Sequence, residues 1–115
     1  MVNPMVHHEP AELDAVFAAL ADPTRRAIVR RLAAGDASVS ELSEPFDMTL
    51  TAVAKHLGVL ARAGLVEQRK EGRVRRCRLA PQALCAAHGW LGEYGRFWEG
   101  QLDSLAAHLG GPARD

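Results

Sequence analysis

Apolar residues recur at spacings of three and four along much of this chain, which predicts helices that each bury one face. The four clearest stretches are residues 10–21, 23–34, 49–64 and 84–109. In the third stretch, the residues expected to face the core are Leu50, Val53, Leu57 and Leu60. The last stretch is long, and a break within it is expected near Gly89 because glycine weakens a helix interior.

Capping residues mark where several of these helices begin. Asp22 precedes a proline, which is the order of an N-cap followed by a first-turn proline. Ser38 and Glu41 have the spacing of a capping box, which predicts a short extra helix as far as about residue 46. Residues 47–48 then form a tight turn, and Thr49 can cap the helix that follows.

The spacing changes to that of strands in residues 65–69 and 74–79, and Glu71 and Gly72 supply a turn between them. The expected fold class is therefore mainly α with a small β-hairpin. Two helices joined by a tight turn and followed by a hairpin are typical of a winged helix-turn-helix. We expect one such domain over residues 10–109, with flexible ends at residues 1–9 and 110–115.

Length and composition agree with a single globular domain: the chain has 115 residues, of which 48% are hydrophobic and 24% charged. No apolar run approaches the roughly 20 residues of a membrane helix. The first ten residues lack the pattern of a signal peptide, so a cytoplasmic protein without a membrane partner is expected. Two cysteines, Cys77 and Cys85, are too few for a disulfide framework and are expected to be thiols.

Charge is distributed unevenly, although the formal net charge is zero. Residues 49–80 hold eight basic and two acidic side chains, whereas the residues on either side are net acidic. A concentrated positive patch favours a polyanionic partner, although a solvated basic hairpin without a partner would have the same charge. Nothing in the sequence groups a nucleophile with a base or a metal, so an enzyme is not expected.

The helix over residues 49–64 carries side chains suited to DNA. Thr51 and Lys55 fall on its outer surface, and a hydroxyl or an ammonium group can reach base edges in the major groove. The alternative is that Thr49 is only a cap and Lys55 only a solvated charge. Five cations surround the hairpin turn, more than a protected strand edge requires, and we expect phosphate or minor-groove contacts from them. They are Arg69, Lys70, Arg73, Arg75 and Arg76.

Four of the six aromatic residues lie within residues 90–98, where they and nearby leucines form a broad apolar face. Apolar residues of the first helix also need a partner, which predicts a two-fold dimer built from the first and last helices. An intramolecular core is the alternative. The residues expected at the dimer interface are Leu13, Val16, Phe17, Trp90, Tyr94, Phe97, Trp98, Leu102 and Leu105.

Two segments make the sequence recognisable. Residues 17–26 read Phe-Ala-Ala-Leu-Ala-Asp-Pro-Thr-Arg-Arg, and residues 50–60 read Leu-Thr-Ala-Val-Ala-Lys-His-Leu-Gly-Val-Leu. Both resemble segments of the ArsR/SmtB-type bacterial repressors, and the match covers about residues 12–80. The resemblance implies a homodimeric winged-helix repressor of a pseudo-palindromic operator in double-stranded DNA. It implies DNA contacts in the hairpin and at Thr49, Thr51, Ala52, Lys55 and His56; Ala54 stands where the family often has serine.

The chain departs from this family at the metal ligands. Ser38 and Ser40 align with a pair of thiolate ligands, and serine hydroxyls are poor ligands for soft metals. The positions aligned with the other common metal site hold Pro81, Ala83, Tyr94 and Phe97, and none of these side chains can serve there. We therefore expect no metal site and no cofactor, and the sequence identifies no effector.

Two other functions stay open at this point. A redox-switched repressor would use Cys77 and Cys85; the arginines beside Cys77 favour its thiolate, although its parity in the strand favours burial in the core. A winged helix used only for protein contacts would show no salt-dependent affinity for DNA.

Overall fold

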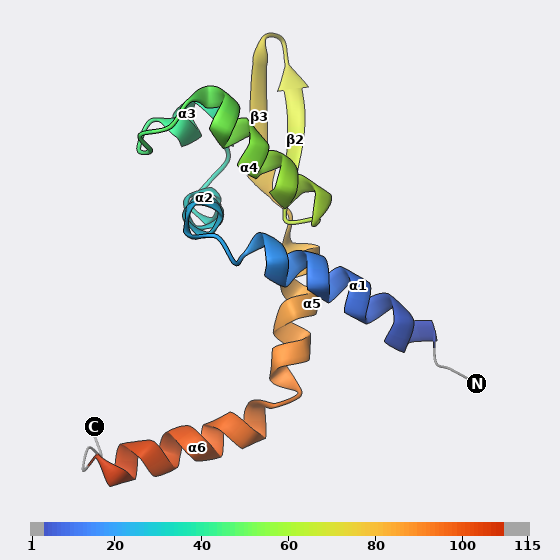
Figure 1. Ribbon diagram of the computed structural model, residues 1–115, viewed down its shortest axis with the longest axis vertical. Helices are drawn as coiled ribbons and strands as arrows, with labels where there is room; N and C mark the ends of the chain where they lie inside the picture. Colours follow the sequence, from blue (N-terminus) through green and yellow to red (C-terminus); the bar gives the residue numbers. More distant parts are fainter. Residues whose placement is uncertain (1–3, 110–115) are drawn as a thin grey trace.

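The computed structural model describes the backbone of residues 4–109, and over this range the chain forms six helices and three strands (Figure 1). Side chains are described for residues 12–109 except Arg96 and Trp98. The elements are α1 (Pro4–Ala19), α2 (Pro23–Ala33), β1 (Ala37–Ser38), α3 (Val39–Ser43), α4 (Leu50–Arg62), β2 (Val66–Glu71), β3 (Val74–Leu79), α5 (Pro81–Gly92) and α6 (Gly95–His108). The predicted class, mainly α with a small β-hairpin, is confirmed. Within the described range, none of the helices combines the length and the apolar character needed to cross a membrane.

The local capping signals are confirmed. Asp22 accepts a hydrogen bond from the backbone N–H of Arg25 at 3.0 Å, at the start of α2. Ser38 and Glu41 form both halves of the capping box, with bonds of 3.1 and 2.8 Å. Thr49 caps α4 by accepting from the N–H of Ala52 at 3.0 Å. Each bond joins residues three apart, which is why the sequence was sufficient to predict them.

Several helix boundaries differ from the predictions. α1 begins at Pro4 instead of Pro10, and a proline at Pro4 is equally suited to the first helical position. The expected long last helix is two helices, and the break lies at Glu93 and Tyr94 instead of at Gly89. The short α3 ends at Ser43, earlier than expected. Of the two expected flexible ends, residues 1–3 and 110–115 lie outside the described range.

The sheet is antiparallel with strand order β1-β3-β2, so the predicted hairpin has a third strand that the sequence analysis missed. β1 has only two residues, too few to show alternation, and pairs Ala37 with Cys77 and Ser38 with Arg76. In the hairpin, Glu71 pairs with Val74, so the turn itself is formed by residues 72–73. Gly72 has a φ of 64°, a left-handed conformation that favours glycine.

One core lies between α1, α2, α3, α4, α5 and the sheet. Its largest fully buried side chains are Ile28, Leu42, Leu57, Leu60, Leu65, Val16, Val53 and Cys77. Three of the four α4 residues predicted to face the core do so, but Leu50 is 54% exposed. Leu50 continues the apolar stripe by spacing, yet the core ends before the first turn of the helix.

The chain is much more extended than a single globule. Its radius of gyration is 18.1 Å, against roughly 13 Å for a compact chain of this length. Figure 1 shows the reason: α5 leads away from the core, and α6 turns off at the end of α5 and lies apart from the other elements. All the described side chains between residues 97 and 109 are exposed. Among the residues that the structure describes, α6 therefore has an apolar face without a partner.

Candidate nucleic-acid interface

α4 presents one face to the core and the other to solvent. Val53 and Leu57 are completely buried, which anchors the helix against the rest of the domain. Thr51 and Lys55 are exposed on the outer face, and Ala52 is partly exposed. The short α3 and the turn that follows hold the start of α4 at the surface beside the hairpin (Figure 1). A rigid helix with an exposed cation and hydroxyl near its N-terminus has the chemistry to read base edges.

His56 is placed differently from the other α4 residues that the sequence analysis assigned to DNA. Its side chain is only 20% exposed and faces the junction of α1 and α2. Nη1 of Arg25 donates to Nδ1 of His56 at 3.3 Å, and a carboxylate oxygen of Asp22 lies 3.9 Å from the same nitrogen. Arg25 also donates through Nε to the carbonyl of Ala19 at 2.6 Å. His56 thus links α4 to the start of α2 and, through Arg25, to the end of α1, a contact that positions the helix.

Asp22 takes part in this network while it caps α2. The N–H of Arg25 is the main influence that lowers the pKa of the Asp22 carboxyl, and the Arg25 guanidinium charge acts in the same direction. The carboxylate therefore stays ionised at neutral pH and keeps its bond to the helix. The cap was predictable from residue spacing, but the contact with His56 was not, because His56 lies 34 positions further along the chain.

The strand register divides the cations of the hairpin between two faces. Lys70 and Arg75 are paired across β2 and β3, on the same face as the buried Cys77. On the other face, Nε of Arg69 lies 3.7 Å from one oxygen of Glu71, and Nε of Arg76 lies 4.0 Å from the other. Such exposed ion pairs contribute little stability, but they reduce the net positive charge of that face.

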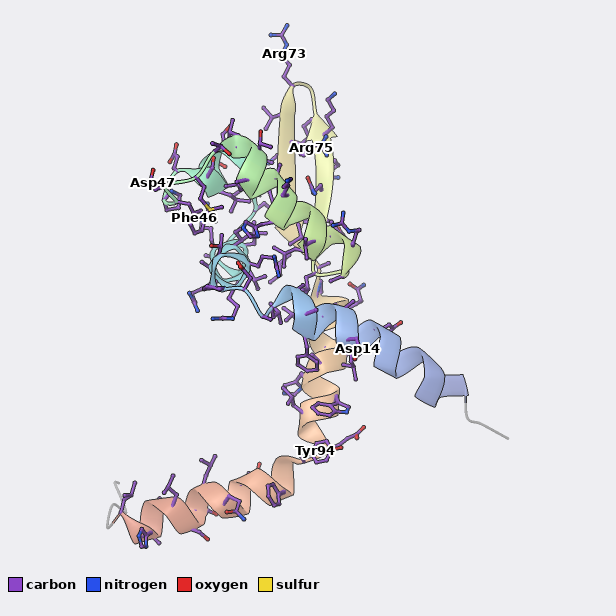
Figure 2. All side chains as sticks on the ribbon, in the orientation of Figure 1. Asp14, Phe46, Asp47, Arg73, Arg75 and Tyr94 are labelled. Carbon is purple, nitrogen blue, oxygen red and sulfur yellow. The ribbon has the colours of Figure 1, made fainter. Side chains whose placement is uncertain are left out.

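Arg73 lies at the tip of the hairpin and projects away from it, while Arg75 lies lower down the strands (Figure 2). Over the part of the chain that the structure describes, Lys70, Arg73 and Arg75 form no ion pair with a carboxylate. The β2–β3 hairpin is the wing of the predicted fold. Of its five cations expected to contact DNA, these three are the ones whose charge is not paired with a carboxylate of the described residues.

A groove of about 540 Å³ separates the start of α4 from the hairpin. It is lined by Ser38, Val39, Ser40, Leu50, Thr51, Ala54, Arg73, Val74 and Arg75. The groove combines hydroxyl groups and two arginines with several apolar side chains. Leu50 and Val74 were not predicted to be part of this surface, because alternation and helical spacing give no information on which apolar residues stay uncovered.

The residues predicted to form the dimer interface are partly buried and partly exposed. Leu13 and Val16 are buried in the core of the single chain, so they are not available to a partner, which corrects that expectation. Phe17 packs edge-on against Trp90 with ring centroids 5.8 Å apart, and Trp90 lies 5.2 Å from Tyr94. These rings, and the side chains of Phe97, Leu102 and Leu105, are more than one-third exposed. The side chain of Trp98 lies outside the described residues.

The two thiols have different environments. Cys77 is buried in the core as its strand parity predicted, and burial raises the pKa of its thiol despite the opposing charges of Arg75 and Arg76. Cys85 is exposed on α5. In the described part of the chain, no three His, Cys, Asp or Glu side chains are grouped so that they could hold a metal ion.

Comparison with known proteins shows which protein families share this sequence and geometry. Residues 20–69 match the model of a helix-turn-helix domain family. The chain is 42% identical over 93 residues to the HTH-type transcriptional regulator Rv2034 of Mycobacterium tuberculosis. The matched segment covers 81% of this chain and 84% of the relative. It is also 34% identical over 70 residues to the biofilm growth-associated repressor of Agrobacterium fabrum, covering 61% of this chain and 60% of that protein.

Solved structures agree with these relatives. The crystal structure of an ArsR family transcriptional regulator has 46% sequence identity and a TM-score of 0.73, and the match covers 78% of this chain and 93% of the other. An ArsR-like transcriptional regulator from Rhodococcus sp. RHA1 has 38% identity and a TM-score of 0.66, with 84% and 92% of the two chains covered.

Proposed function

Because this chain belongs to the ArsR family of winged helix-turn-helix transcriptional regulators, we propose that it is a homodimeric repressor that binds a pseudo-palindromic operator through α4 and the hairpin wing. As a member of this family it is a DNA-binding regulator and not an enzyme. Repression by occupying a promoter takes place on the chromosome, so the proposal includes the cytoplasmic location expected from the sequence.

The observation that carries the proposal is the exposed positive charge on α4 and on the adjacent hairpin, which no carboxylate of the described residues pairs. A helix the size of α4 fits the major groove, where Lys55 can donate to guanine and Thr51 can contact a base edge. A hairpin beside it crosses the phosphate backbone, where Lys70, Arg73 and Arg75 supply cations. Thr49 accepts one bond as a cap and keeps its O–H for a phosphate.

Dimerisation is supported by the uncovered apolar residues of α1, α5 and α6. A single chain has one recognition helix, whereas a two-fold dimer presents two recognition helices to half-sites about one turn of the DNA helix apart. We place Phe17, Trp90, Tyr94, Phe97, Leu102 and Leu105 in this interface, because all six are largely apolar and exposed in the single chain.

The proposed repressor uses no metal, because serines occupy the positions aligned with the thiolate ligands. A switch through both thiols has less support, since a buried thiol with a raised pKa forms little of the reactive thiolate.

The experiment that tests this function is the substitution Lys55→Ala. We expect affinity for the DNA upstream of the coding sequence to fall by about 1–3 kcal/mol, because a contact to a base edge is lost. Fluorescence anisotropy measures this affinity for the upstream duplex and for a scrambled duplex, at several salt concentrations and with or without zinc. Arg30→Ala removes the same charge from the exposed surface of α2 and should leave specificity unchanged.

Three outcomes of this titration would argue against parts of the proposal. Unchanged affinity in Lys55→Ala would contradict the assignment of α4 to the DNA interface. Release by zinc would reveal a metal site. A wild-type protein that prefers no duplex would favour the protein-contact function instead.

Arg75→Ala tests the role of the wing. Because a phosphate contact carries no sequence information, we expect affinity to fall equally for specific and scrambled duplexes, and the salt slope to decrease by about one. Arg78→Ala is the matched control: the residue lies on the same strand but on the opposite face, 3.8 Å from Glu67. A loss confined to the specific duplex would show that Arg75 reads bases.

A further inference from the structure

Two large apolar side chains are exposed in the middle of the proposed DNA-binding surface. Leu50 is 54% exposed at the first residue of α4, and Val74 is 44% exposed at the first residue of β3. Both line the groove between α4 and the wing, together with Ala54 one helical turn after Leu50. The packing of the single chain does not explain them, since the buried stripe of α4 begins at Val53.

The groove restricts the chemistry of its occupant. Arg73 and Arg75 line the hairpin side, and Ser40 of α3 and Thr51 of α4 line the other side. Two cations at an opening favour an anionic partner, whereas the apolar side chains favour a hydrocarbon group. The ligand must therefore carry a small apolar group flanked by negative charge.

A DNA duplex has this combination in its major groove. The C5-methyl of thymine is the one hydrocarbon group on the base edges there, and phosphates run along both sides of the groove. We propose that Leu50, with Ala54 and Val74 beside it, packs against a thymine methyl in each operator half-site. This inference rests on the proposed function, because it assigns a base preference to the same surface.

The test replaces each thymine of the upstream duplex by deoxyuridine, one position at a time, which removes only the methyl group. We expect one thymine in each half-site to be sensitive, with affinity about fourfold lower per half-site, the effect of one buried methyl-sized group. In Leu50→Ala, the ratio of affinities for the thymine and uracil duplexes at that position should fall to about one. The variant should fold, because Leu50 is exposed and alanine favours helices.

Lys55→Ala is the matched comparison on the same helix. It should weaken both duplexes equally and leave the ratio of thymine to uracil affinities unchanged, because its contact does not involve the methyl. A contact of Leu50 with the apolar face of deoxyribose would respond to Leu50→Ala but not to uracil.

The possible failures are distinguishable. If the protein prefers the upstream duplex but no uracil substitution weakens it, the proposed methyl contact is wrong and the regulatory function stands. If uracil weakens the wild type and Leu50→Ala equally, another residue reads the methyl, and the role of Leu50 is overturned. If no duplex is preferred, the proposed function itself fails.

Discussion

Leu105→Asp is expected to convert the dimer into monomers and to lower affinity for a two-half-site operator by about 10²- to 10⁴-fold, the avidity lost when two linked binding modules separate. Leu105 lies on the apolar face of α6 and is 52% exposed in the single chain. A carboxylate there is well solvated in the monomer but would be buried and unpaired in the dimer, at high cost. The folded monomer should therefore keep its stability while the association is lost.

Sedimentation velocity measures the oligomeric state, and fluorescence anisotropy measures the affinity for duplexes with two half-sites and with one half-site. Ala107→Asp is a matched control, because residue 107 is exposed on the same helix but about 200° around its axis from Leu105. It introduces the same charge on the opposite face and should leave the dimer intact. A dimeric Leu105→Asp protein with unchanged affinity would show that α6 does not contribute to the interface.

Leu57→Ala should cost about 2–5 kcal/mol of unfolding free energy, because it leaves a cavity behind a fully buried side chain. Leu57 lies on the inner face of α4, so this change removes the packing that holds the reading helix in place. A melting temperature roughly 10 °C lower or more is expected, at about 4 °C per kcal/mol for a domain of this size.

Lys55→Ala is the control for Leu57→Ala, since the two residues lie two positions apart on opposite faces of α4. Lys55 is exposed, so its replacement should change DNA affinity with little effect on melting. Thermal unfolding followed by circular dichroism separates the two effects. Equal melting temperatures for Leu57→Ala and the wild type would contradict the placement of Leu57 in the core.

Several features were predictable because they depend on residues close together in sequence. The caps at Asp22, Ser38 and Thr49 each satisfy an N–H three residues away, so residue type and spacing were sufficient. The change from helical to strand spacing identified the hairpin, and residue parity placed Cys77 in the core. The winged helix-turn-helix followed from the order of these elements.

Other features depend on which surfaces meet, and the tertiary structure alone decided them. Leu13 and Leu50 have the same apolar character and helical spacing, yet one is buried and the other exposed, because the core extends over α1 but stops short of the start of α4. His56 turns toward Arg25 because α4 packs beside the junction of α1 and α2. The pairing of β1 with β3 likewise depends on residues about 40 positions apart.

Sequence therefore determined most of the helices, the hairpin, the caps and the family, since hydrogen bonds within one helical turn and the local spacing of apolar residues specify them. The tertiary structure decided which cations of the wing keep a free charge, which apolar residues stay uncovered and where the last helix breaks. The physical reason is that burial and ion pairing depend on contacts between distant segments, and a pattern along the chain does not specify those contacts.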